Sequence, residues 1–271
     1  MKSHFHNKVV IVTGASSGIG KETALAFGRD GARVVMVARR GEVLRQIAEA
    51  NPQLQLRPIP ADITTPDAAA EIATTTLREF GRIDILVNNA GIGQRGSFAE
   101  LNFDDARRVM ELNFFALLRC TQAVVPSMRQ QGGGQIVNIS SIVGVIATPQ
   151  NSIYCASKFA VQALSDSLRL ELGPAGIDVI SILPSYTDTP FFDNQIRTSG
   201  PARLSSIRGQ SPAHVAMVIL RACRHRRREV VLTLSGNLGC LVKRLFPGFV
   251  DWCLRRLSAR NGDNSSCNGK T

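Results

Sequence analysis

The stretch Thr13-Gly14-Ala15-Ser16-Ser17-Gly18-Ile19-Gly20 decides the fold, because it joins an apolar run, Val9–Val12, to a segment of helical period, Ile19–Asp30. Glycines let the backbone turn tightly and approach a pyrophosphate closely, and the start of a helix offers free N–H groups to an anion. A glycine cluster alone is weak evidence, but the strand–loop–helix context makes an ordinary turn a poor explanation. The predicted cofactor contacts in this loop are Gly14, Ser16, Ser17, Gly18, Ile19 and Gly20.

Short runs rich in Val and Ile alternate with longer segments of helical period. The runs are Val9–Val12, Arg33–Val37, Leu54–Ile59, Ile83–Val87, Gln135–Ile139 and Asp178–Leu183. The helical segments are Ile19–Asp30, Glu42–Ala50, Pro66–Phe80, Phe103–Arg129 and Ile153–Leu172. Strands that are apolar on both faces belong to a parallel sheet with helices on both sides, and right-handed connections make it doubly wound. We therefore predict an α/β fold, a single Rossmann-type doubly wound parallel sheet flanked by helices, with a C-terminal amphipathic helical extension.

The length of the chain and the distribution of its charges indicate how it is divided into domains. The chain has 271 residues, 44% apolar and 20% charged, which is typical of a globular protein. Residues 1–202 carry 19 basic and 18 acidic side chains, whereas residues 203–271 carry 13 and 3, so nearly all of the net charge of +11 lies in the last quarter. We predict a Rossmann-fold domain over 1–235 with the cofactor and substrate sites, a basic amphipathic helical extension over 236–260, and a disordered tail over 261–271.

Cysteine spacing and hydropathy exclude other classes of protein. The six cysteines show no C-x-x-C spacing and the histidines are too scattered to complete a zinc site, so we predict no metal and free thiols in a reducing compartment. The short polar segment 1–7 lacks the apolar core of a signal peptide, and no run of 18 apolar residues occurs. The predicted location is the cytoplasm.

The end of the second predicted strand indicates which dinucleotide is bound. An NAD(H) site often places an acidic residue here to accept from the ribose 2′-hydroxyl, but this chain has Arg39 and Arg40. A guanidinium pairs with a 2′-phosphate through two hydrogen bonds, so NADP(H) is favoured over NAD(H), unless both arginines are simply solvated. Asp62, after the third strand, is either an acceptor for the adenine amino group or a turn residue, and Ile63 follows it as a further predicted contact.

Tyr154 and Lys158 are four residues apart at the start of a helical segment, so they share one face. A neighbouring ammonium lowers the pKa of tyrosine and makes its hydroxyl a usable acid or base near neutral pH. Ser140 and Ser141 end the fifth predicted strand, at the sheet edge where ligands bind. Alone, the Tyr–Lys pair would be a surface feature, but with the serine and the glycine loop it predicts a catalytic site.

Together, TGASSGIG (13–20), NNAG (88–91), Asn113, Ser141 and YCASK (154–158) resemble the short-chain dehydrogenase/reductase family, in its NADP(H)-preferring type, over residues 5–235. The spacing of thirteen residues between Ser141 and Tyr154 favours Ser141 over Ser140. The resemblance implies that Tyr154 donates or accepts the proton and that Ser141 orients the substrate oxygen. It implies that Lys158 holds the nicotinamide ribose and that Asn113 supports a water next to it.

The resemblance extends to the residues that flank the cofactor. It implies that Asn88, Ala90 and Gly91 flank the cofactor and stabilise the central sheet, and that Asn89, Ala90 and Gly91 contact the cofactor. The family usually has Pro-Gly after the sixth strand, but this chain has Pro184-Ser185, and because serine lacks the backbone freedom of glycine we expect a different local path. Pro184 is a predicted cofactor contact, and Thr187 or Thr189 is still expected to reach the nicotinamide carboxamide.

These residues predict an oxidoreductase that moves a hydride between NADP(H) and a carbonyl or alcohol, with the protein supplying position and electrostatics. Apolar residues that follow the serine or lie in the loop after the sixth strand are either core or the lining for a hydrophobic substrate, such as a steroid, retinoid or long-chain acyl compound. They are Ile142, Val143, Val145, Ile146, Phe191 and Phe192. The predicted substrate contacts are Ser141, Val143, Tyr154, Phe191 and Phe192. The alternative is a non-catalytic NADP(H)-binding scaffold or regulatory protein, against which the complete catalytic set argues.

The basic segment 236–260 carries two apolar stripes flanked by Lys and Arg. It contains no recognised nucleic-acid motif, so we predict no nucleic-acid partner. The stripes either pack on the domain, pack on a second subunit, or lie on an anionic membrane surface at its cytoplasmic face. The family resemblance implies a homodimer or homotetramer formed through the helical segments Phe103–Arg129 and Ile153–Leu172.

Overall fold

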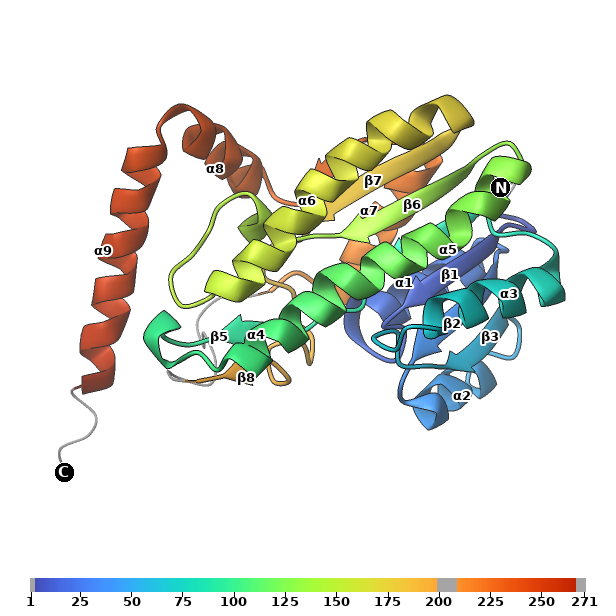
Figure 1. Cartoon of the computed structure of the whole chain (residues 1–271), viewed down its shortest axis with the longest axis horizontal. Helices are drawn as coiled ribbons and strands as arrows, with labels where there is room; N and C mark the ends of the chain where they lie inside the picture. The colour runs from blue at the N-terminus through green and yellow to red at the C-terminus, as the bar shows by residue number, and fades with distance from the viewer. Residues whose placement is uncertain (1–2, 199–208, 267–271) are drawn as a thin grey trace.

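The computed structural model describes residues 3–198 and 209–266, with side chains described as far as Arg256. Its centre is a sheet of seven parallel strands in the order β3-β2-β1-β4-β6-β7-β9 (Figure 1). The strands are β1 (Val9–Thr13), β2 (Arg33–Ala38), β3 (Gln55–Pro60), β4 (Ile85–Asn88), β6 (Gly134–Ile139), β7 (Ile177–Leu183) and β9 (Glu229–Val231). The strand order reverses between β1 and β4, which makes their carboxyl ends the switch point where such sheets bind ligands.

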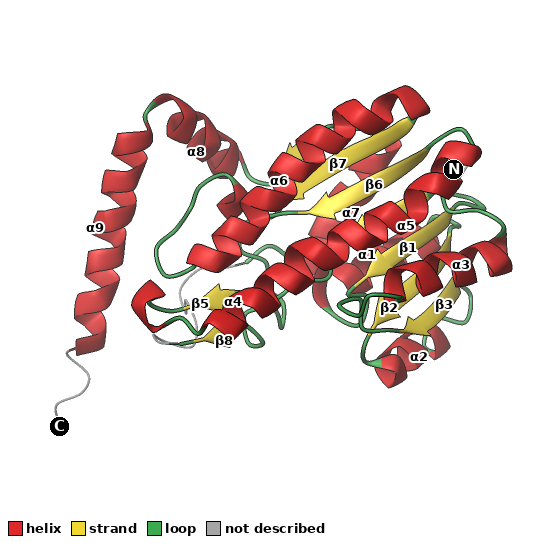
Figure 2. Ribbon diagram, in the orientation of Figure 1, coloured by secondary structure: helices red, strands yellow, loops and turns green. Residues whose placement is uncertain are grey.

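Helices cover both faces of this sheet (Figure 2). One layer holds α1 (Gly18–Arg29), α2 (Gly41–Glu49) and α7 (Pro212–Arg224), and the other α3 (Ala68–Phe80), α5 (Ala116–Gln130) and α6 (Ser152–Leu172). Successive strand residues serve the two layers in turn, because Val10 and Val12 face the first layer and Ile11 faces the second. The predicted doubly wound α/β sheet is confirmed.

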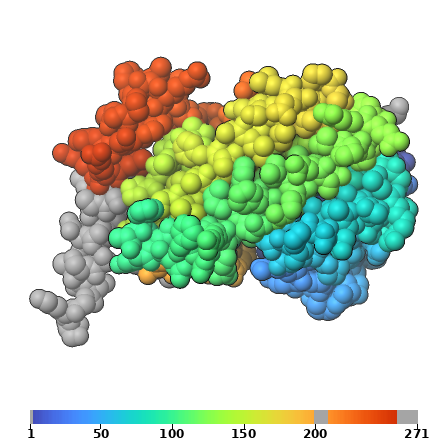
Figure 3. All heavy atoms as spheres, viewed as in Figure 1, coloured from blue at the N-terminus to red at the C-terminus, as the bar shows by residue number. Residues whose placement is uncertain are grey.

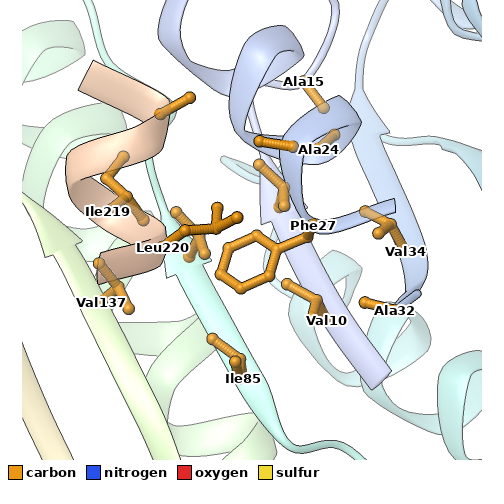
Figure 4. Close-up of a cluster of buried hydrophobic side chains, with 14 of the residues drawn as sticks. Val10, Ala15, Ala24, Phe27, Ala32, Val34, Ile85, Val137, Ile219 and Leu220 are labelled. Atoms are coloured by element: carbon orange, nitrogen blue, oxygen red, sulfur yellow. The ribbon is translucent and has the colours of Figure 1, made fainter. Parts of the chain in front are cut away.

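The core of the first layer is built around Phe27 of α1, whose side chain is fully buried (Figure 4). Its neighbours in the cluster come from the strands and from α7, which supplies Ile219 and Leu220. The sequence interpretation missed α7, because the basic run at 221–228 dominates the pattern there. The buried residues Val215, Ile219 and Cys223 nevertheless recur at helical spacing.

The predicted helix Phe103–Arg129 is interrupted. It consists of α4 (Phe103–Met110), a π-helical turn η2 (Glu111–Phe115) and α5. A π turn accommodates one extra residue in the helical ladder and is frequent at functional sites. Short elements complete the described fold: the 3₁₀ turns η1 (Phe98–Glu100), η3 (Ile142–Gly144) and η4 (Gly173–Ala175), and a separate two-stranded sheet of β5 (Gln94–Arg95) and β8 (Ile196–Arg197).

The C-terminal extension is a helical hairpin of α8 (Leu234–Leu245) and α9 (Pro247–Ser266), which stands out from one end of the molecule (Figure 3). Strand β9 ends at Val231, and two residues later Thr233 caps α8 by accepting from the N–H of Gly236 at 3.0 Å. Helix α9 continues to Ser266, into the segment predicted to be disordered, and residues 267–271 of that segment lie outside the described residues. None of the described helices is both long and apolar enough to cross a membrane.

Candidate active site

The glycine loop forms a close cradle at the start of α1. Gly14 and Gly18 have φ angles of 67° and 53°, in the left-handed region that favours glycine. A Cβ on Gly20 would lie 2.4 Å from the carbonyl oxygen of Gly14 and 2.4 Å from Nδ2 of Asn89. Ser17, the N-cap of α1, makes no side-chain capping bond, so the first N–H groups of the helix are available to an anion.

Hydrogen bonds hold the NNAG segment against this loop. Thr13 Oγ1 accepts from the N–H groups of Asn89 and Ala90 at 3.0 and 3.1 Å, and Asn89 Nδ2 donates to the carbonyl oxygen of Thr13 at 2.9 Å. Asn88 is buried and its Nδ2 donates to Asn138 Oδ1 at 3.0 Å. These bonds fix the carboxyl ends of β1, β4 and β6 relative to one another.

Arg40 lies across the glycine loop. Its Nη2 donates to Ser16 Oγ at 2.9 Å and to Ser17 Oγ at 3.1 Å. Both Arg39 and Arg40 are exposed, so their charges are accessible from solvent. The structure thus brings the Arg40 guanidinium and two hydroxyls together at the end of β2, while the charge of Arg39 acts on Asp62.

Asp62 has the hydrogen bonds of a turn residue. Its Oδ1 accepts from the N–H and the hydroxyl of Thr64 at 3.1 and 2.7 Å. Burial would raise the pKa of this carboxyl, but the Thr64 bonds and the charge of Arg39 hold it below its usual value. Ile63 is buried in the second apolar layer. Asp62 is therefore an ionised acceptor beside Arg39.

Tyr154 lies in the first turn of α6 and faces Ser141 at the end of β6. The two hydroxyls are hydrogen-bonded, and Ser141 Oγ also accepts from the N–H of Val143 at 3.3 Å. Ser140 points elsewhere, since its buried hydroxyl donates to the carbonyl oxygen of Lys158 at 3.2 Å. Of the two serines, Ser141 is the one that the fold presents to the tyrosine.

Lys158 is buried one helical turn after Tyr154. Its Nζ donates to the carbonyl oxygen of Ile139 at 2.8 Å and lies 5.9 Å from the ring centroid of Tyr154. A Cβ on Gly91 would lie 3.7 Å from this Nζ, so the NNAG segment passes directly over the ammonium. Burial lowers the pKa of Lys158 to about 8.

The pKa of Tyr154 moves opposite to the sequence-based expectation. Burial raises it well above 10, and the hydrogen bond to Ser141 offsets only part of that shift. The ammonium of Lys158 is directed to a backbone carbonyl rather than to the phenol oxygen. In the chain by itself, desolvation therefore outweighs the attraction of the ammonium for a phenolate.

Asn113 lies in the π turn and is buried. Its Oδ1 accepts from the N–H of Ile92 at 2.8 Å, and its Nδ2 donates to the carbonyl oxygen of Ile92 at 3.0 Å and to Ser157 Oγ at 3.0 Å. The side chain thus clamps the NNAG loop to α6, one residue before Lys158. This clamping role was not predicted, since the resemblance implied only a water near the lysine.

The departure at Ser185 has a structural explanation. Ser185 does not have a positive φ, so the backbone here needs no glycine. Its hydroxyl is 3.1 Å from Thr233 Oγ1, which links the loop after β7 to the cap of α8. In this loop Thr187 is buried, and the side chain of Thr189 lies 3.1 Å from where a Cβ on Gly18 would stand. Pro184 contributes a carbonyl oxygen 3.5 Å from Ser141 Oγ.

Aromatic side chains stand beside the catalytic tyrosine. The ring of Phe191 is 5.7 Å from that of Tyr154, Phe192 packs edge-on against Phe191 at 5.3 Å, and Tyr186 packs on Phe192 at 4.5 Å. Phe191, Phe192 and the nearby Val143 are only partly buried. We name Tyr186, Phe191 and Phe192 the aromatic wall, of which Tyr186 was not predicted.

Two other predicted lining residues have a packing role. The Cδ1 atoms of Ile142 and Ile146 lie 3.4 and 3.2 Å from where Cβ atoms on Gly236 and Gly239 would stand. Glycines on this face of α8 let the helix approach the loop after Ser141. Both isoleucines are partly buried against α8, and neither belongs to the buried core clusters.

A dinucleotide cradle beside a Ser–Tyr–Lys cluster defines the class of nicotinamide-dependent oxidoreductases. Residues 8–199 match the family model of short chain dehydrogenases, and the chain belongs to that family, as its motifs predicted. The chain is 36% identical over 261 residues to dehydrogenase/reductase SDR family member 7B of Bos taurus, covering 92% of this chain and 80% of the relative. A short-chain dehydrogenase structure from Streptomyces avermitilis is 32% identical, with a TM-score of 0.80 over 93% of this chain and 98% of that one.

Two further solved relatives contain a dinucleotide. An alcohol dehydrogenase from the archaeon Thermococcus sibiricus, complexed with 5-hydroxy-NADP, is 25% identical with a TM-score of 0.75, over 83% of this chain and 95% of that one. A 3-ketoacyl-(acyl-carrier-protein) reductase from Brucella melitensis, complexed with NADH, is 25% identical with a TM-score of 0.77, over 84% and 97%. Relatives of this fold thus bind nicotinamide cofactors of both kinds.

Proposed function

We propose that the protein is an NADP(H)-dependent oxidoreductase that interconverts a carbonyl and an alcohol on a hydrophobic substrate. The observation that carries this proposal is the hydrogen-bonded pair Ser141–Tyr154, with Lys158 buried below it and the NNAG segment above. The residues fit a nicotinamide dinucleotide, because the glycine cradle leaves no room for Cβ atoms and leaves helix N–H groups free. When bound, the nicotinamide ring supplies or accepts the hydride.

The chain's own residues handle the oxygen and the proton. The Ser141 and Tyr154 hydroxyls converge where a substrate oxygen would accept two hydrogen bonds, and the Tyr154 hydroxyl passes a proton to that oxygen during reduction. The raised pKa of Tyr154 keeps its proton in place until transfer. The ammonium of Lys158 then favours the phenolate that results, while Asn113 fixes the loop above the lysine.

The two tyrosines of the chain provide a matched test. Tyr154→Phe should lower turnover by about a thousandfold, because general acid–base catalysis contributes roughly that much. Binding of NADPH, followed by fluorescence, should change little. Tyr186→Phe removes the other phenol hydroxyl and should retain turnover. If Tyr154→Phe turns over like the unaltered protein, the assignment is wrong; if the unaltered protein binds NADPH but reduces no carbonyl in a broad panel, the scaffold alternative is correct.

The preference for NADP(H) rests on Arg39 and Arg40. Arg40 already spans the loop hydroxyls of Ser16 and Ser17, where a 2′-phosphate would add an acceptor. Arg39→Ala and Arg40→Ala should each weaken NADPH binding at least about tenfold more than NADH binding, since charge-assisted pairs are strong. Arg45→Ala, in the exposed ion pair with Glu42, is the control. Equal losses for both cofactors would contradict the role.

A homo-oligomer formed through α4, α5 and α6 is the proposed assembly. Phe103, Phe159 and Leu170 are large apolar side chains that stay exposed on α4 and α6, and Phe115 is exposed in the π turn between α4 and α5. Exposed apolar groups gathered on one layer are typical of subunit contacts. Light scattering of purified protein tests the mass, and Leu170→Glu should shift it toward the monomer, whereas Leu234→Glu on α8 should not.

The helical hairpin is proposed to bind an anionic membrane surface. Five residues of its apolar stripes, Leu238, Leu241, Leu245, Phe249 and Trp252, are at least half exposed, which supports this proposal. Between Leu234 and Arg256 it has four basic residues and one acidic residue, and that charge favours anionic lipid over a second copy of the same basic surface. The extension predicted from sequence corresponds to this hairpin.

Flotation with liposomes tests the membrane proposal. The full chain should float with vesicles that contain phosphatidylglycerol and remain below with pure phosphatidylcholine vesicles. Phe249→Ser with Trp252→Ser should abolish flotation, because the hairpin loses the apolar area that would be buried in the membrane. Phe98→Ser with Met217→Ser removes two exposed apolar side chains from the domain and should float normally. Flotation of both double variants would contradict the role of the hairpin.

A further inference from the structure

Two arginines are paired in the small sheet beside the aromatic wall. The register of β5 and β8 places Arg95 opposite Arg197, and Gln94 opposite Ile196. Opposite residues of parallel strands point to the same face of the sheet. The Cα atoms of Arg95 and Arg197 are therefore about 5 Å apart, with both side chains on one face.

The face of the β5–β8 sheet that carries the two arginines starts next to the aromatic wall. Gly93 lies two residues before Arg95 and shares its face. A Cβ on Gly93 would lie 3.1 Å from Phe191 Cε1 and 3.1 Å from the Cβ of Gln195, which lies two residues before Arg197. Because Phe191 packs on Tyr154, the face runs from the catalytic end to the arginines, about 7 Å further along the strand.

Neither arginine has an acidic partner among the described residues. The ion pairs that the described chain forms use other basic side chains, and Arg197 Nη2 donates only to the carbonyl oxygen of Phe192 at 2.7 Å. The Nε atoms of both arginines are buried without a hydrogen-bond partner. A buried donor without a partner is unfavourable, and two neighbouring positive charges repel each other. One anion between the two guanidinium groups would relieve both costs.

We propose that Arg95 and Arg197 bind an anionic group of the substrate, a carboxylate or a phosphate, at the end remote from the reacting carbonyl. The inference rests on the proposed function, which places the carbonyl at Ser141 and Tyr154. The apolar body of the substrate then lies along the aromatic wall, and its charged end meets the two guanidinium forks, which match either oxyanion. The substrate class is an oxo or hydroxy compound with an apolar body and an anionic terminus.

The test compares substrates that differ only at their termini. The probes are medium-chain oxocarboxylates, their methyl esters and the corresponding oxoalkyl phosphates, offered with NADPH to the full-length protein. The unaltered protein should show a KM for one anionic series at least about tenfold below that of the esters, since charge-assisted hydrogen bonds are worth that much. The series with the lower KM identifies the carboxylate or the phosphate.

Substitution of each arginine should remove that preference. Arg95→Gln and Arg197→Gln should raise the KM of the preferred anion about tenfold with kcat nearly unchanged, as expected for lost ground-state binding, and leave the esters within about twofold. Arg95→Lys should recover part of the loss. Arg78→Gln, which removes an exposed arginine from α3 at the far end of the molecule, is the control (Figure 1).

Calorimetry on Tyr154→Phe separates this proposal from the proposed function. Binding of the preferred anionic probe to the NADPH complex should persist in Tyr154→Phe and be lost when Arg95→Gln is added. Equal binding of acid and ester, or equal losses for both in the arginine variants, would overturn the anion site and leave the oxidoreductase intact. Arginine-dependent anion binding in a protein that reduces nothing would overturn the oxidoreductase and keep the site.

Discussion

The catalytic domain and the C-terminal hairpin use the same kind of amphipathic helix in opposite surroundings. Phe27 on α1 is fully buried between the sheet and α7, whereas Trp252 on α9 is half exposed, with Phe249 stacked on it and the guanidinium of Arg256 4.3 Å from its ring. Apolar periodicity is thus enough to form a helix but does not determine what covers its apolar face. In the domain a sheet covers it, and on the hairpin the described residues leave it open.

The largest contrast should appear in stability when Phe27 is truncated. Phe27→Ala removes a fully buried ring from between α1 and α7 and should lower the free energy of unfolding by about 3–5 kcal/mol. Urea unfolding followed by circular dichroism measures the change. A loss below about 1 kcal/mol would mean that the core repacks around the truncated side chain. The domain and the hairpin would then differ in the exposure of their apolar residues but not in what those residues contribute to stability.

Removing the charge of the buried Lys158 should change the free energy of unfolding more than removing an exposed charge from the hairpin. Burial lowers its pKa from 10.5 to about 8, so below pH 8 the folded domain holds an ammonium that burial disfavours. Lys158→Met should therefore raise the free energy of unfolding at pH 7 by about 1–2 kcal/mol, after subtracting the lost bond to Ile139, and should abolish turnover.

The sign of the pH dependence makes this prediction specific. As the pH rises from 8 to 10.5, the folded protein loses this proton before the unfolded chain does, so the unaltered protein gains stability and the advantage of Lys158→Met shrinks. Urea unfolding at pH 7 and pH 10 measures this change. Arg256→Met, on the exposed side of the hairpin, should show no such dependence. An advantage of equal size at both pH values would contradict burial as the cause.

A smaller effect is expected where the two regions join. Thr233 caps α8 and also meets Ser185 of the loop after β7 at 3.1 Å. Thr233→Ala should lower the free energy of unfolding by about 1 kcal/mol, typical of a lost cap, and Ser185→Gly by less, because the cap survives. A double-mutant cycle measured by thermal unfolding isolates the Ser185–Thr233 bond. Additive effects would mean that the hairpin and the loop are independent.

Much of the fold could be predicted because the apolar residues of the domain recur with the periods of strands and helices. The alternation of Val10, Ile11 and Val12 between two layers follows directly from apolar runs. Helix α7 was missed because its apolar stripe is short and its last turn merges with a basic run. The π turn at Asn113 was missed because nothing in single-residue propensity marks one inserted residue.

The site was predictable where roles depend on chain spacing and not where they depend on tertiary neighbours. The spacing of Ser141, Tyr154 and Lys158 already selects one helix face and one strand end. The pKa of Tyr154 was predicted in the wrong direction because its burial outweighs the ammonium. The pairing of Arg95 with Arg197 joins segments a hundred residues apart through two-residue strands, for which no local pattern exists.

The smallest effect on stability is expected from Trp252→Ala, and for that reason it sharpens the contrast with Phe27 most. Within its own helix Trp252 stacks on Phe249 at 6.1 Å and meets the guanidinium of Arg256. An exposed cation–π contact contributes about 0.5–1 kcal/mol to local helix order, so global unfolding in urea should shift by less than about 0.5 kcal/mol. Flotation on anionic vesicles should nevertheless weaken, because an interfacial tryptophan contributes most where lipid covers it. If Trp252→Ala destabilises the protein as much as Phe27→Ala does, the apolar face of the hairpin is covered by protein in solution, and oligomer mass, not flotation, would be the property that changes.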